Sequence, residues 1–576
     1  MKEKTAVSPT KLDQISKYMP GINTVRTYNR KWLPKDIVAG LVLSALLVPQ
    51  GMAYAELAGL PAITGLYTTV MCLVAYAMFG PSPYLVLGPD SSLGPMIAAA
   101  IIPLLVTDDP AEAIALAGMM ALFVGLISAG AGVAKFGFVA DLISKPVRVG
   151  YLAGLSVTIF IGQLPKLLGI SIDADNIFEE VLAVFASFDE INWWAFSAGA
   201  LALIIIMVLK RWKPLWPGIL IAVVVAVLFS MVFSLSIKGV DVVGVLPQGF
   251  PLPSFPRAPL SSWPLLFAAA LGMSLVTIGD TISTSAGFAA RSGNEVDSNQ
   301  ELIGIGAANL LAGVFQGFPV STSSSRTAVA EQSGAKTQLT GMVAAALVLS
   351  MLLFVPGLVK DMPQSVLAAV VIIASIGLFD MAELRRLWKM RKSEFILAIV
   401  AILSVAMIGV LEGIVIAIGL SILQFFERSW RPHSAILGKN GKDGYQDIDT
   451  HEDAKPIDGM LIIRWDAPLF FANANIFRDL VRRLIVETEP TPFWVVITAE
   501  PMTDVDSTAA DMLVDLDLEL NANGRHLIFA EVSPPVKEKI IAYGLLDTID
   551  HRHFFPTIKQ AAKAFRKEQK AREEEE

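Results

Sequence analysis

The chain has 576 residues, of which 54% are hydrophobic and 17% charged, and its mean hydropathy is +0.59. This composition excludes an ordinary soluble protein of this length and indicates an integral membrane protein. The formal net charge of −8 says little about partners, because the charges are sorted along the chain, and we expect no nucleic-acid partner.

Cysteine and histidine usage limits the chemistry that the apolar region can support. Cys72 is the only cysteine, which excludes disulfides within the chain and multi-cysteine metal sites. All histidines follow the apolar region: His433, His451, His526, His551 and His553. Proton chemistry at membrane depth must therefore use carboxylates, and we expect neither a metal site nor a cofactor.

Residues 1–35 form a basic N-terminal segment, with eight lysines and arginines against two acids. No apolar run precedes them, so we expect no signal peptide, and the positive-inside rule places this segment in the cytoplasm. The basic runs 210–213 ("KRWK") and 385–392 ("RRLWKMRK") should lie on the same side. The acidic loop 172–180 ("IDADNIFEE") should lie outside.

Residues 36–428 are the predicted transmembrane domain. At about 20 residues per crossing plus a short loop, this length holds roughly 12 to 14 spans. Fourteen spans fit if the two basic runs follow spans six and twelve and the acidic loop follows span five. Both termini then lie in the cytoplasm.

Two stretches early in this domain interrupt the regular helix pattern. They are 48–67 ("VPQGMAYAELAGLPAITGLY") and 84–95 ("YLVLGPDSSLGP"), in which prolines and glycines stand among polar side chains. Broken backbone is tolerated at membrane depth where it lines a cavity or is buried in protein. Ordinary kinks and loops are the alternative.

The second half of the domain repeats this layout. Pro49 and Pro89 are 40 residues apart, as are Gly279 and Pro319, and a hydroxyl-rich run follows in "LVLGPDSS" and in "QGFPVSTSSS". Paired broken segments at corresponding places indicate a transporter built from inverted repeats. Its substrate would lie between facing N-termini of half-helices.

The run 321–333 holds seven hydroxyl side chains and one arginine, Arg326. We expect Arg326 in the first turns of a short helix that begins near Ser321. The free N–H groups, the helix dipole and the guanidinium would all favour an anion there. The alternative is that Arg326 only neutralises Glu331 or Asp280.

Two carboxylates belong to the interrupted segments. Asp280 and Thr284 are four residues apart and share one helix face. A carboxylate at membrane depth is costly and marks an ion path or a proton site, which is the role we expect for Asp280. Asp90 follows Pro89 at the start of the other short helix, where it either caps the turn or takes part in ion coupling.

After Arg428 the sequence changes to mixed charged and apolar segments. We expect a linker at 429–455, a soluble domain at 456–570 and an acidic tail at 571–576. The segments "MLIIRWDAPLFFANA", "FWVVITAEPM" and "RHLIFAEVS" predict strands that alternate with an amphipathic helix, in a small α/β unit.

Several of these segments resemble the SulP (sulfate permease) family of anion transporters. Residues 48–67 are similar to the family's first-span signature, residues 296–341 to its long second signature, and "RSWRPHSAILG" to its link to a C-terminal STAS domain. The resemblance covers nearly the whole chain. It implies an all-α polytopic membrane domain of 14 spans in two inverted repeats of seven, a core domain that moves against a gate domain, and a C-terminal α/β STAS domain. It also implies a homodimer in a bacterial inner (plasma) membrane, in contact with lipid.

The resemblance also implies functional residues. The family's anion pocket falls on Gln50, Tyr54, Pro89, Asp90, Ser91, Ser323, Ser325 and Arg326. Asp280 matches an acid linked to proton or sodium coupling in bacterial relatives. Thr284 matches a hydroxyl that helps to hold sodium in bicarbonate-transporting relatives. Asp90 departs from the family pattern, since many relatives have an uncharged residue there.

In soluble STAS proteins a Ser or Thr of one loop is phosphorylated, and Ser507 and Thr508 occupy the similar turn here. Ala509 replaces the family's glycine in this turn. Capping of a helix by Asp506 or Ser507 is the alternative interpretation. We expect cytoplasmic regulators at this domain.

These features favour a secondary active transporter and not an enzyme, because the membrane region shows no recognisable pair of nucleophile and base. Our interpretation is import of a small inorganic or organic anion, sulfate first, with co-transported H⁺ or Na⁺ by alternating access. The alternatives are sodium-coupled bicarbonate transport, proton-coupled C4-dicarboxylate transport, a passive anion channel and a membrane-tethered signalling protein.

Overall fold

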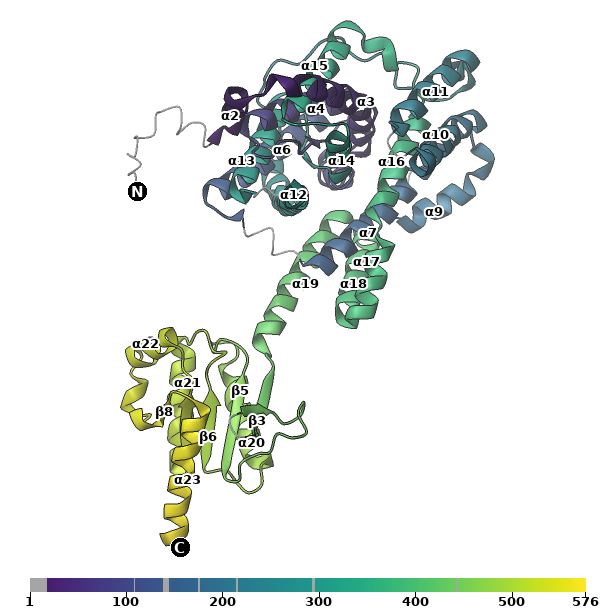
Figure 1. Cartoon of the computed structure of the whole chain (residues 1–576). Coiled ribbons are helices and arrows are strands. Elements are labelled where there is room, and N and C mark those ends of the chain that lie inside the picture. Colours follow the sequence, from purple (N-terminus) through teal and green to yellow (C-terminus); the bar gives the residue numbers. More distant parts are fainter. Residues whose placement is uncertain are drawn as a thin grey trace, which may run out of the picture. The chain divides into compact units, whose positions relative to one another are not determined.

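The computed structural model describes residues 18–107, 109–137, 144–172, 174, 177–213, 216–292, 296–441 and 444–575. The chain divides into two compact units, Met1–Ser421 and Ile422–Glu576. In its described ranges, the regular structure of the first unit is helical apart from two short strands (Figure 1). Its helices are α2 (Pro20–Thr27), α3 (Leu33–Leu57), α4 (Ala62–Phe79), α5 (Gly94–Ile101), α6 (Pro110–Val133), α7 (Lys145–Gly162), α8 (Leu164–Leu168), α9 (Ile177–Ala186), α10 (Trp193–Trp212), α11 (Gly218–Phe233), α12 (Trp263–Ser292), α13 (Ser298–Val314), α14 (Ser324–Gln332), α15 (Leu339–Phe354), α16 (Gln364–Leu378), α17 (Met381–Met390), α18 (Lys392–Met407) and α19 (Val410–Trp430), which continues into the second unit.

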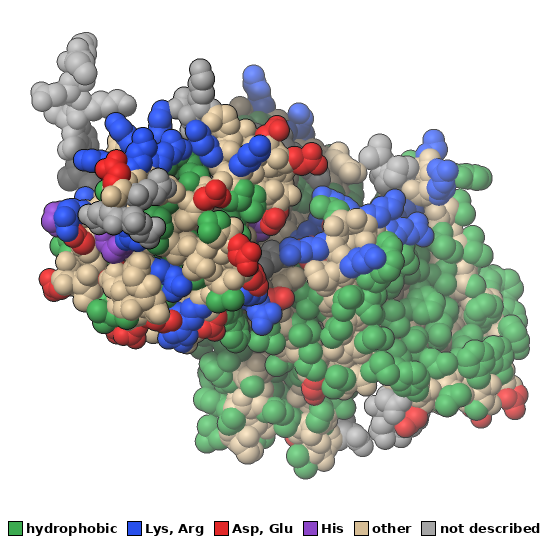
Figure 2. Space-filling model, turned by 90° about the horizontal axis from the view of Figure 1, so that it is seen from below, with side chains coloured by type: hydrophobic (Ala, Val, Ile, Leu, Met, Phe, Trp, Pro, Cys, Tyr) green, Lys and Arg blue, Asp and Glu red, His purple; other side chains and the backbone are tan. Residues whose placement is uncertain are grey.

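Many of these helices are long and apolar enough to cross a bilayer. Among the described residues, seven helical stretches meet that length and composition, and shorter apolar helices lie at Gly94–Leu104, Gly218–Phe233, Leu339–Phe354 and Val410–Gln424. Figure 2 shows a large continuous area of hydrophobic side chains over this unit, whereas the histidine-bearing second unit shows acidic, basic and neutral side chains mixed together. The chain is a multi-pass membrane protein.

The membrane helices form two groups, both visible in Figure 1. In the first helix group, α13 packs against α4 and α6, and α15 packs against α3 and α4, with α5, α12 and α14 beside them. In the second helix group, α18 and α16 pack against α7, and α10 packs against α11 and α16. The two groups meet where α16 and α11 contact α3.

Glycines allow the closest of these helix contacts. A Cβ atom at Gly306 of α13 would lie 2.6 Å from the backbone nitrogen of Ala129 in α6. A Cβ atom at Gly313, two turns further along α13, would lie 2.6 Å from the carbonyl oxygen of Gly118. Small residues are the usual means of close helix approach in a bilayer, where apolar burial alone does not drive association. The α6–α13 pair is therefore a tightly packed support for the segments that follow α13.

The two interrupted stretches meet at a crossing in the first helix group. Strand β1 (Leu87–Gly88) pairs antiparallel with β2 (Ser321–Thr322), with Leu87 opposite Thr322 and Gly88 opposite Ser321. Helix α5 follows the first strand and α14 follows the second. The sequence predicted that these two regions share a layout, and the structure places them side by side.

The second unit is an α/β domain, as the sequence predicted. Its sheet has the order β4-β3-β5-β6-β7-β8 and comprises β3 (Ser434–Asn440), β4 (Gly444–Asp447), β5 (Met460–Trp465), β6 (Trp494–Thr498), β7 (His526–Ala530) and β8 (Phe554–Phe555). The last four strands are parallel, which requires helical crossovers. The helices are α20 (Ala474–Glu487), α21 (Ser507–Ala522), α22 (Pro534–Ala542) and α23 (Ile558–Glu575).

The side chains of β5 point alternately to the two faces of the sheet, and both faces are covered by helices. Leu461 and Ile463 belong to a hydrophobic cluster that includes Phe477 of α20 and residues of α21 and α22. Met460 and Ile462 belong to a separate cluster with Phe565 of α23. Successive side chains of a strand point to opposite faces, so one apolar run supplies two cores.

Candidate functional site

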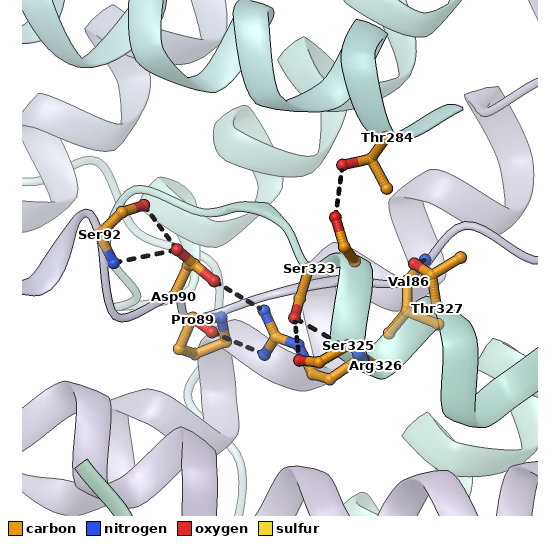
Figure 3. Close-up of polar contacts among 10 residues, drawn as sticks. Val86, Pro89, Asp90, Ser92, Thr284, Ser323, Ser325, Arg326 and Thr327 are labelled. Carbon is orange, nitrogen blue, oxygen red and sulfur yellow. Dashed lines mark hydrogen bonds and ion pairs between the residues drawn. The ribbon is translucent and has the colours of Figure 1, made fainter. Parts of the chain in front are cut away.

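The site is built around the crossing of β1 with β2, where each strand ends just before a half-helix. Asp90 closes the turn after β1, because its Oδ2 accepts hydrogen bonds from Ser92 N at 3.0 Å and from Ser92 Oγ at 2.5 Å. Ser323 is the N-cap of α14, and its Oγ accepts from Arg326 N at 3.4 Å. Short polar side chains are the usual caps at such positions. Figure 3 shows both turns.

Helix α14 begins at Ser324, three residues later than the sequence predicted. The reason is that Ser321 and Thr322 are extended and pair with β1. Helix α5 begins at Gly94, so Asp90 precedes it by a full turn. Asp90 therefore does not cap α5, whose N-cap is Leu93, but closes the turn before it, as the capping alternative expected for this turn.

The Arg326 side chain joins the two halves of the crossing. It is 1% exposed, and its Nη1 donates to the Pro89 carbonyl oxygen at 2.6 Å. Its Nη2 lies 3.6 Å from Asp90 Oδ1, within ion-pair range but beyond a hydrogen bond. A Cβ at Gly88 would come within 2.8 Å of Nη1, so the guanidinium needs a glycine there. The ion-pair partner in the structure is Asp90, where the sequence interpretation offered Glu331 or Asp280.

A cavity of about 740 Å³ lies against this crossing. The first helix group contributes most of its polar lining, which consists of Gln50, Tyr54, Asp90, Ser91, Ser92, Asp280, Thr284, Thr322, Ser323, Ser324, Ser325, Gln332 and Ser333. The second helix group contributes an apolar wall from α7, α11 and α16, and Lys210 from α10. Arg326 and Pro89 are not part of the lining. The cavity therefore lies between the two helix groups, and eight of the ten anion-pocket and ion-coupling residues expected from the sequence line it.

Asp280 and Thr284 both line the cavity from α12, as their spacing predicted. Thr284 Oγ1 lies 3.0 Å from Ser324 Oγ, so α12 contacts the start of α14 through a pair of hydroxyls (Figure 3). Thr277 and Thr281 of the same helix are buried, and their hydroxyl oxygens have no hydrogen-bond partner among the described residues. This part of α12 thus carries the Asp280 carboxylate together with three threonine hydroxyls, each within about one helical turn of it.

Unpartnered polar atoms also gather at the crossing itself. Within the described part of the chain, these buried atoms are Ser321 Oγ, Thr322 Oγ1, and Arg326 Nε and Nη2, and Gln50 Oε1 of α3 is a further one in the cavity lining. Buried polar groups are nearly always hydrogen-bonded, and exceptions cluster where a ligand, an ion or water completes the set. The hydroxyls and the guanidinium N–H groups can donate, which suits a ligand with acceptor oxygens, whereas Gln50 Oε1 can only accept.

Three further residues hold the crossing in shape, and sequence reasoning missed them. The Asn309 side chain accepts from Val320 N at 2.9 Å and donates to Val320 O at 3.2 Å. Thr68 Oγ1 accepts from Phe318 N at 3.2 Å, and Gln338 donates to the Leu85 carbonyl at 2.9 Å. The signal that the sequence offered was a single polar residue inside an apolar run, such as Asn309 in "AANLL". Each satisfies backbone groups that the broken helices leave free.

In the second unit, Asp506 caps α21, because its Oδ1 accepts from Ala509 N at 2.8 Å. Its Oδ2 accepts from Phe471 N at 2.8 Å. Ser507 and Thr508 are the first residues of this helix and are exposed. The structure therefore displays the capping alternative and leaves both hydroxyls accessible.

Broken helices that cross within one group of membrane helices, beside a polar cavity shared with a second group, are typical of a membrane carrier. The chain belongs to the sulfate permease family, whose model matches residues 33–401, and a STAS domain model matches residues 452–561. The family consists of transporters and not enzymes. The family resemblance of the sequence is thereby confirmed.

Two relatives illustrate the breadth of this similarity. The chain is 39% identical over 551 residues to a probable sulfate transporter of Mycobacterium tuberculosis, which covers 96% of this chain and 98% of the relative. It is 31% identical over 569 residues to the chloroplastic sulfate transporter 4.1 of Arabidopsis thaliana, covering 96% and 83%.

Solved structures share the fold at lower identity. The structure of SLC26A9 superposes with a TM-score of 0.88 at 22% identity and covers 100% of this chain and 98% of that one. The transmembrane domain of the cyanobacterial bicarbonate transporter BicA gives a TM-score of 0.59 at 21% identity and covers 69% and 97%. The predicted fold, a helical membrane domain followed by a STAS domain, is confirmed.

Proposed function

We propose that this protein is a secondary active transporter that imports a small anion, sulfate first, together with protons or sodium, by alternating access. The observation that carries the proposal is the gathering of buried, unpartnered polar atoms at the β1–β2 crossing, next to the cavity between the helix groups. The N–H groups at the starts of α5 and α14 add further donors and a favourable dipole.

In this proposal Gln50, Tyr54, Ser91, Ser323 and Ser325 contact the anion, since all of them line the cavity. Hydroxyl and amide groups supply hydrogen bonds without adding charge, which suits an oxyanion that must later be released. Arg326 donates to the Pro89 carbonyl and lies beside Asp90, and these contacts hold the two half-helices together. The pair also places a positive and a negative charge behind the anion site.

The charges around the cavity explain why a cation should accompany the anion. Asp90 offsets the charge of Arg326, whereas Asp280 lines the cavity beside Thr284. An anion held ~6 Å from an ionised Asp280 would be repelled by about 3 kcal/mol at an effective dielectric constant of ~20. Protonation of Asp280, or sodium bound by Asp280 and Thr284, removes that repulsion. Binding of the two ions is then mutually dependent, as symport requires.

Energetics also demand a cotransported cation for accumulation. An anion that enters against an inside-negative potential loses ~2.3 kcal/mol per charge per 100 mV, so sulfate would lose ~4.6 kcal/mol at that potential. A passive anion channel has no use for Asp280 and can only equilibrate its substrate. Accumulation of the anion above its equilibrium level therefore distinguishes a cation-coupled transporter from a passive channel.

The first test is a binding experiment on the purified full chain in detergent. Sulfate should raise the unfolding temperature progressively as its concentration exceeds the dissociation constant, because a ligand that binds only the folded state stabilises it. The effect should grow at low pH or with added sodium, according to the coupling ion. A sulfate effect that is independent of both cations would contradict coupling at Asp280.

A further inference from the structure

Helix α17 joins the cavity wall to the next membrane helix and carries an unusual side-chain pattern. It follows α16, whose last residues Gly377 and Leu378 line the cavity, and it precedes α18. Between Glu383 and Glu394 the chain has five basic residues and no acidic one. These basic residues are Arg385, Arg386, Lys389, Arg391 and Lys392, all exposed.

One face of α17 is fixed to the second helix group. Leu384 and Leu387 are 5% and 4% exposed and belong to a hydrophobic cluster with Ala398 of α18 and Val149 of α7. Lys145 Nζ, at the start of α7, lies 2.6 Å from Glu383 Oε1. The helix is therefore anchored, and a force on its outer face would be transmitted to α16 and α7.

The outer face combines apolar and basic side chains. Met381, Trp388 and Met390 are 47%, 53% and 69% exposed. Arg385 and Lys389 are one helical turn apart and so extend from the same side. The Lys392 ammonium lies 5.9 Å from the centre of the Trp388 ring, in cation–π range. Exposed tryptophan with lysine and arginine on one short amphipathic helix is typical of a segment that lies in a membrane interface.

We propose that α17 and the basic residues after it bind the headgroups of anionic phospholipids. Complementary charge is the reason for this choice of partner. Three cations and an exposed indole ring belong to α17, two more cations follow directly after it, and the helix adjoins apolar membrane spans. Bound lipid would hold α17 at the membrane surface and so position α16, which lines the cavity. This surface is distinct from the anion cavity, although its effect on transport rests on the proposed function.

The test compares lipid selectivity of the purified full chain in phosphatidylcholine vesicles that contain trace spin-labelled phosphatidylglycerol or trace spin-labelled phosphatidylcholine. The wild-type chain should prefer the anionic lipid, and added salt should weaken the preference. Arg385→Gln with Lys389→Gln should lower the affinity for phosphatidylglycerol by about 30-fold, which corresponds to ~1 kcal/mol for each side chain. The variant Arg385→Lys with Lys389→Arg keeps both positive charges and should therefore keep the wild-type affinity for phosphatidylglycerol.

A matched control changes the same number of exposed charges elsewhere. Lys567→Gln with Lys570→Gln on α23 should leave the preference at the wild-type level. Unchanged selectivity in the α17 glutamine variant would overturn the proposal. So would competition by millimolar inorganic phosphate, because the side chains would then bind a soluble anion and not a lipid. Since this readout needs no transport, a failure of the proposed transport function would leave its result interpretable.

Discussion

Replacement of Arg326 by alanine tests how the crossing of β1 and β2 works. The guanidinium is 1% exposed, donates to the Pro89 carbonyl at 2.6 Å and lies 3.6 Å from Asp90, whose side chain is 15% exposed. Removing one partner of a buried ion pair typically destabilises by 3–5 kcal/mol. Because Asp90 keeps some contact with solvent, we expect ~3 kcal/mol. The variant also loses a cation behind the site, which should lower sulfate affinity about 10- to 100-fold.

A second variant separates the structural part of this effect from the binding part. Asp90→Asn combined with Arg326→Gln removes both charges, so no buried charge remains unpaired at the crossing. Most of the stability should return, whereas sulfate affinity should stay low. Asp90→Asn alone keeps the bond from Arg326 to Pro89 and should retain or strengthen anion binding.

The assay is thermal unfolding of each purified variant in detergent, with and without sulfate, so that one experiment reports both stability and affinity. Wild-type sulfate affinity in the double variant would show that Arg326 serves only as a counter-charge. Wild-type stability of Arg326→Ala would show that the contacts with Pro89 and Asp90 do not hold the half-helices together.

Three further predictions concern ion coupling, topology and the STAS domain. Asp280→Asn should abolish concentrative uptake but permit anion exchange, measured with labelled sulfate in vesicles loaded with or without unlabelled sulfate; undiminished accumulation would exclude Asp280 as the coupling residue. Reporter fusions after Lys213 and after Glu576 should both signal from the cytoplasm, and an external signal from either would break the scheme of fourteen spans. Burial raises the pKa of Asp517 in α21 from 3.8 to about 6. The folded domain therefore keeps a proton that the unfolded chain releases, and its stability should fall as pH rises from about 4 to about 6 and then level off. Urea unfolding of the second unit should show this slope, and Asp517→Asn should flatten it; an equal slope in the variant would assign it to another group.

The sequence predicted the class of fold and the residues near the cavity more reliably than it predicted their contacts. The 40-residue spacing of Pro49 and Pro89 and of Gly279 and Pro319 located two corresponding broken segments, because proline and glycine are costly inside a membrane helix unless the freed backbone is satisfied. The spacing did not reveal that β1 and β2 pair with each other. Pairing of segments more than 230 residues apart depends on the packing of α4, α6 and α13, which no local pattern encodes.

The partner of Arg326 could not be predicted for the same reason. Glu331 is near it in sequence and Asp280 is the obvious intramembrane acid, yet the structure places it beside Asp90 on the opposite half of the crossing. The position of Asp90 after Pro89 made capping of the turn one of the two roles expected for it, and the carboxylate both closes the turn and faces the guanidinium. Local chemistry therefore identified the residue, whereas its second contact required the fold.

Helix ends followed local rules where side-chain caps act. Asp506 accepts the hydrogen bond from Ala509 N that its position before α21 predicted. The buried supports Asn309 and Thr68 gave no such signal, because a single polar residue in an apolar helix has many possible partners. Their role became apparent only from the backbone groups that they satisfy.

Accumulation of labelled sulfate by the purified full chain in liposomes tests the central claim most directly. Three sets of vesicles are compared: one with an inward proton gradient, one with an inward sodium gradient and one with neither, all at the same membrane potential. We predict that internal sulfate rises above its equilibrium level with one cation gradient only, and that Asp280→Asn vesicles do not exceed equilibrium with either. Sulfate that merely equilibrates under all three conditions would identify a passive pathway and contradict the proposed mechanism.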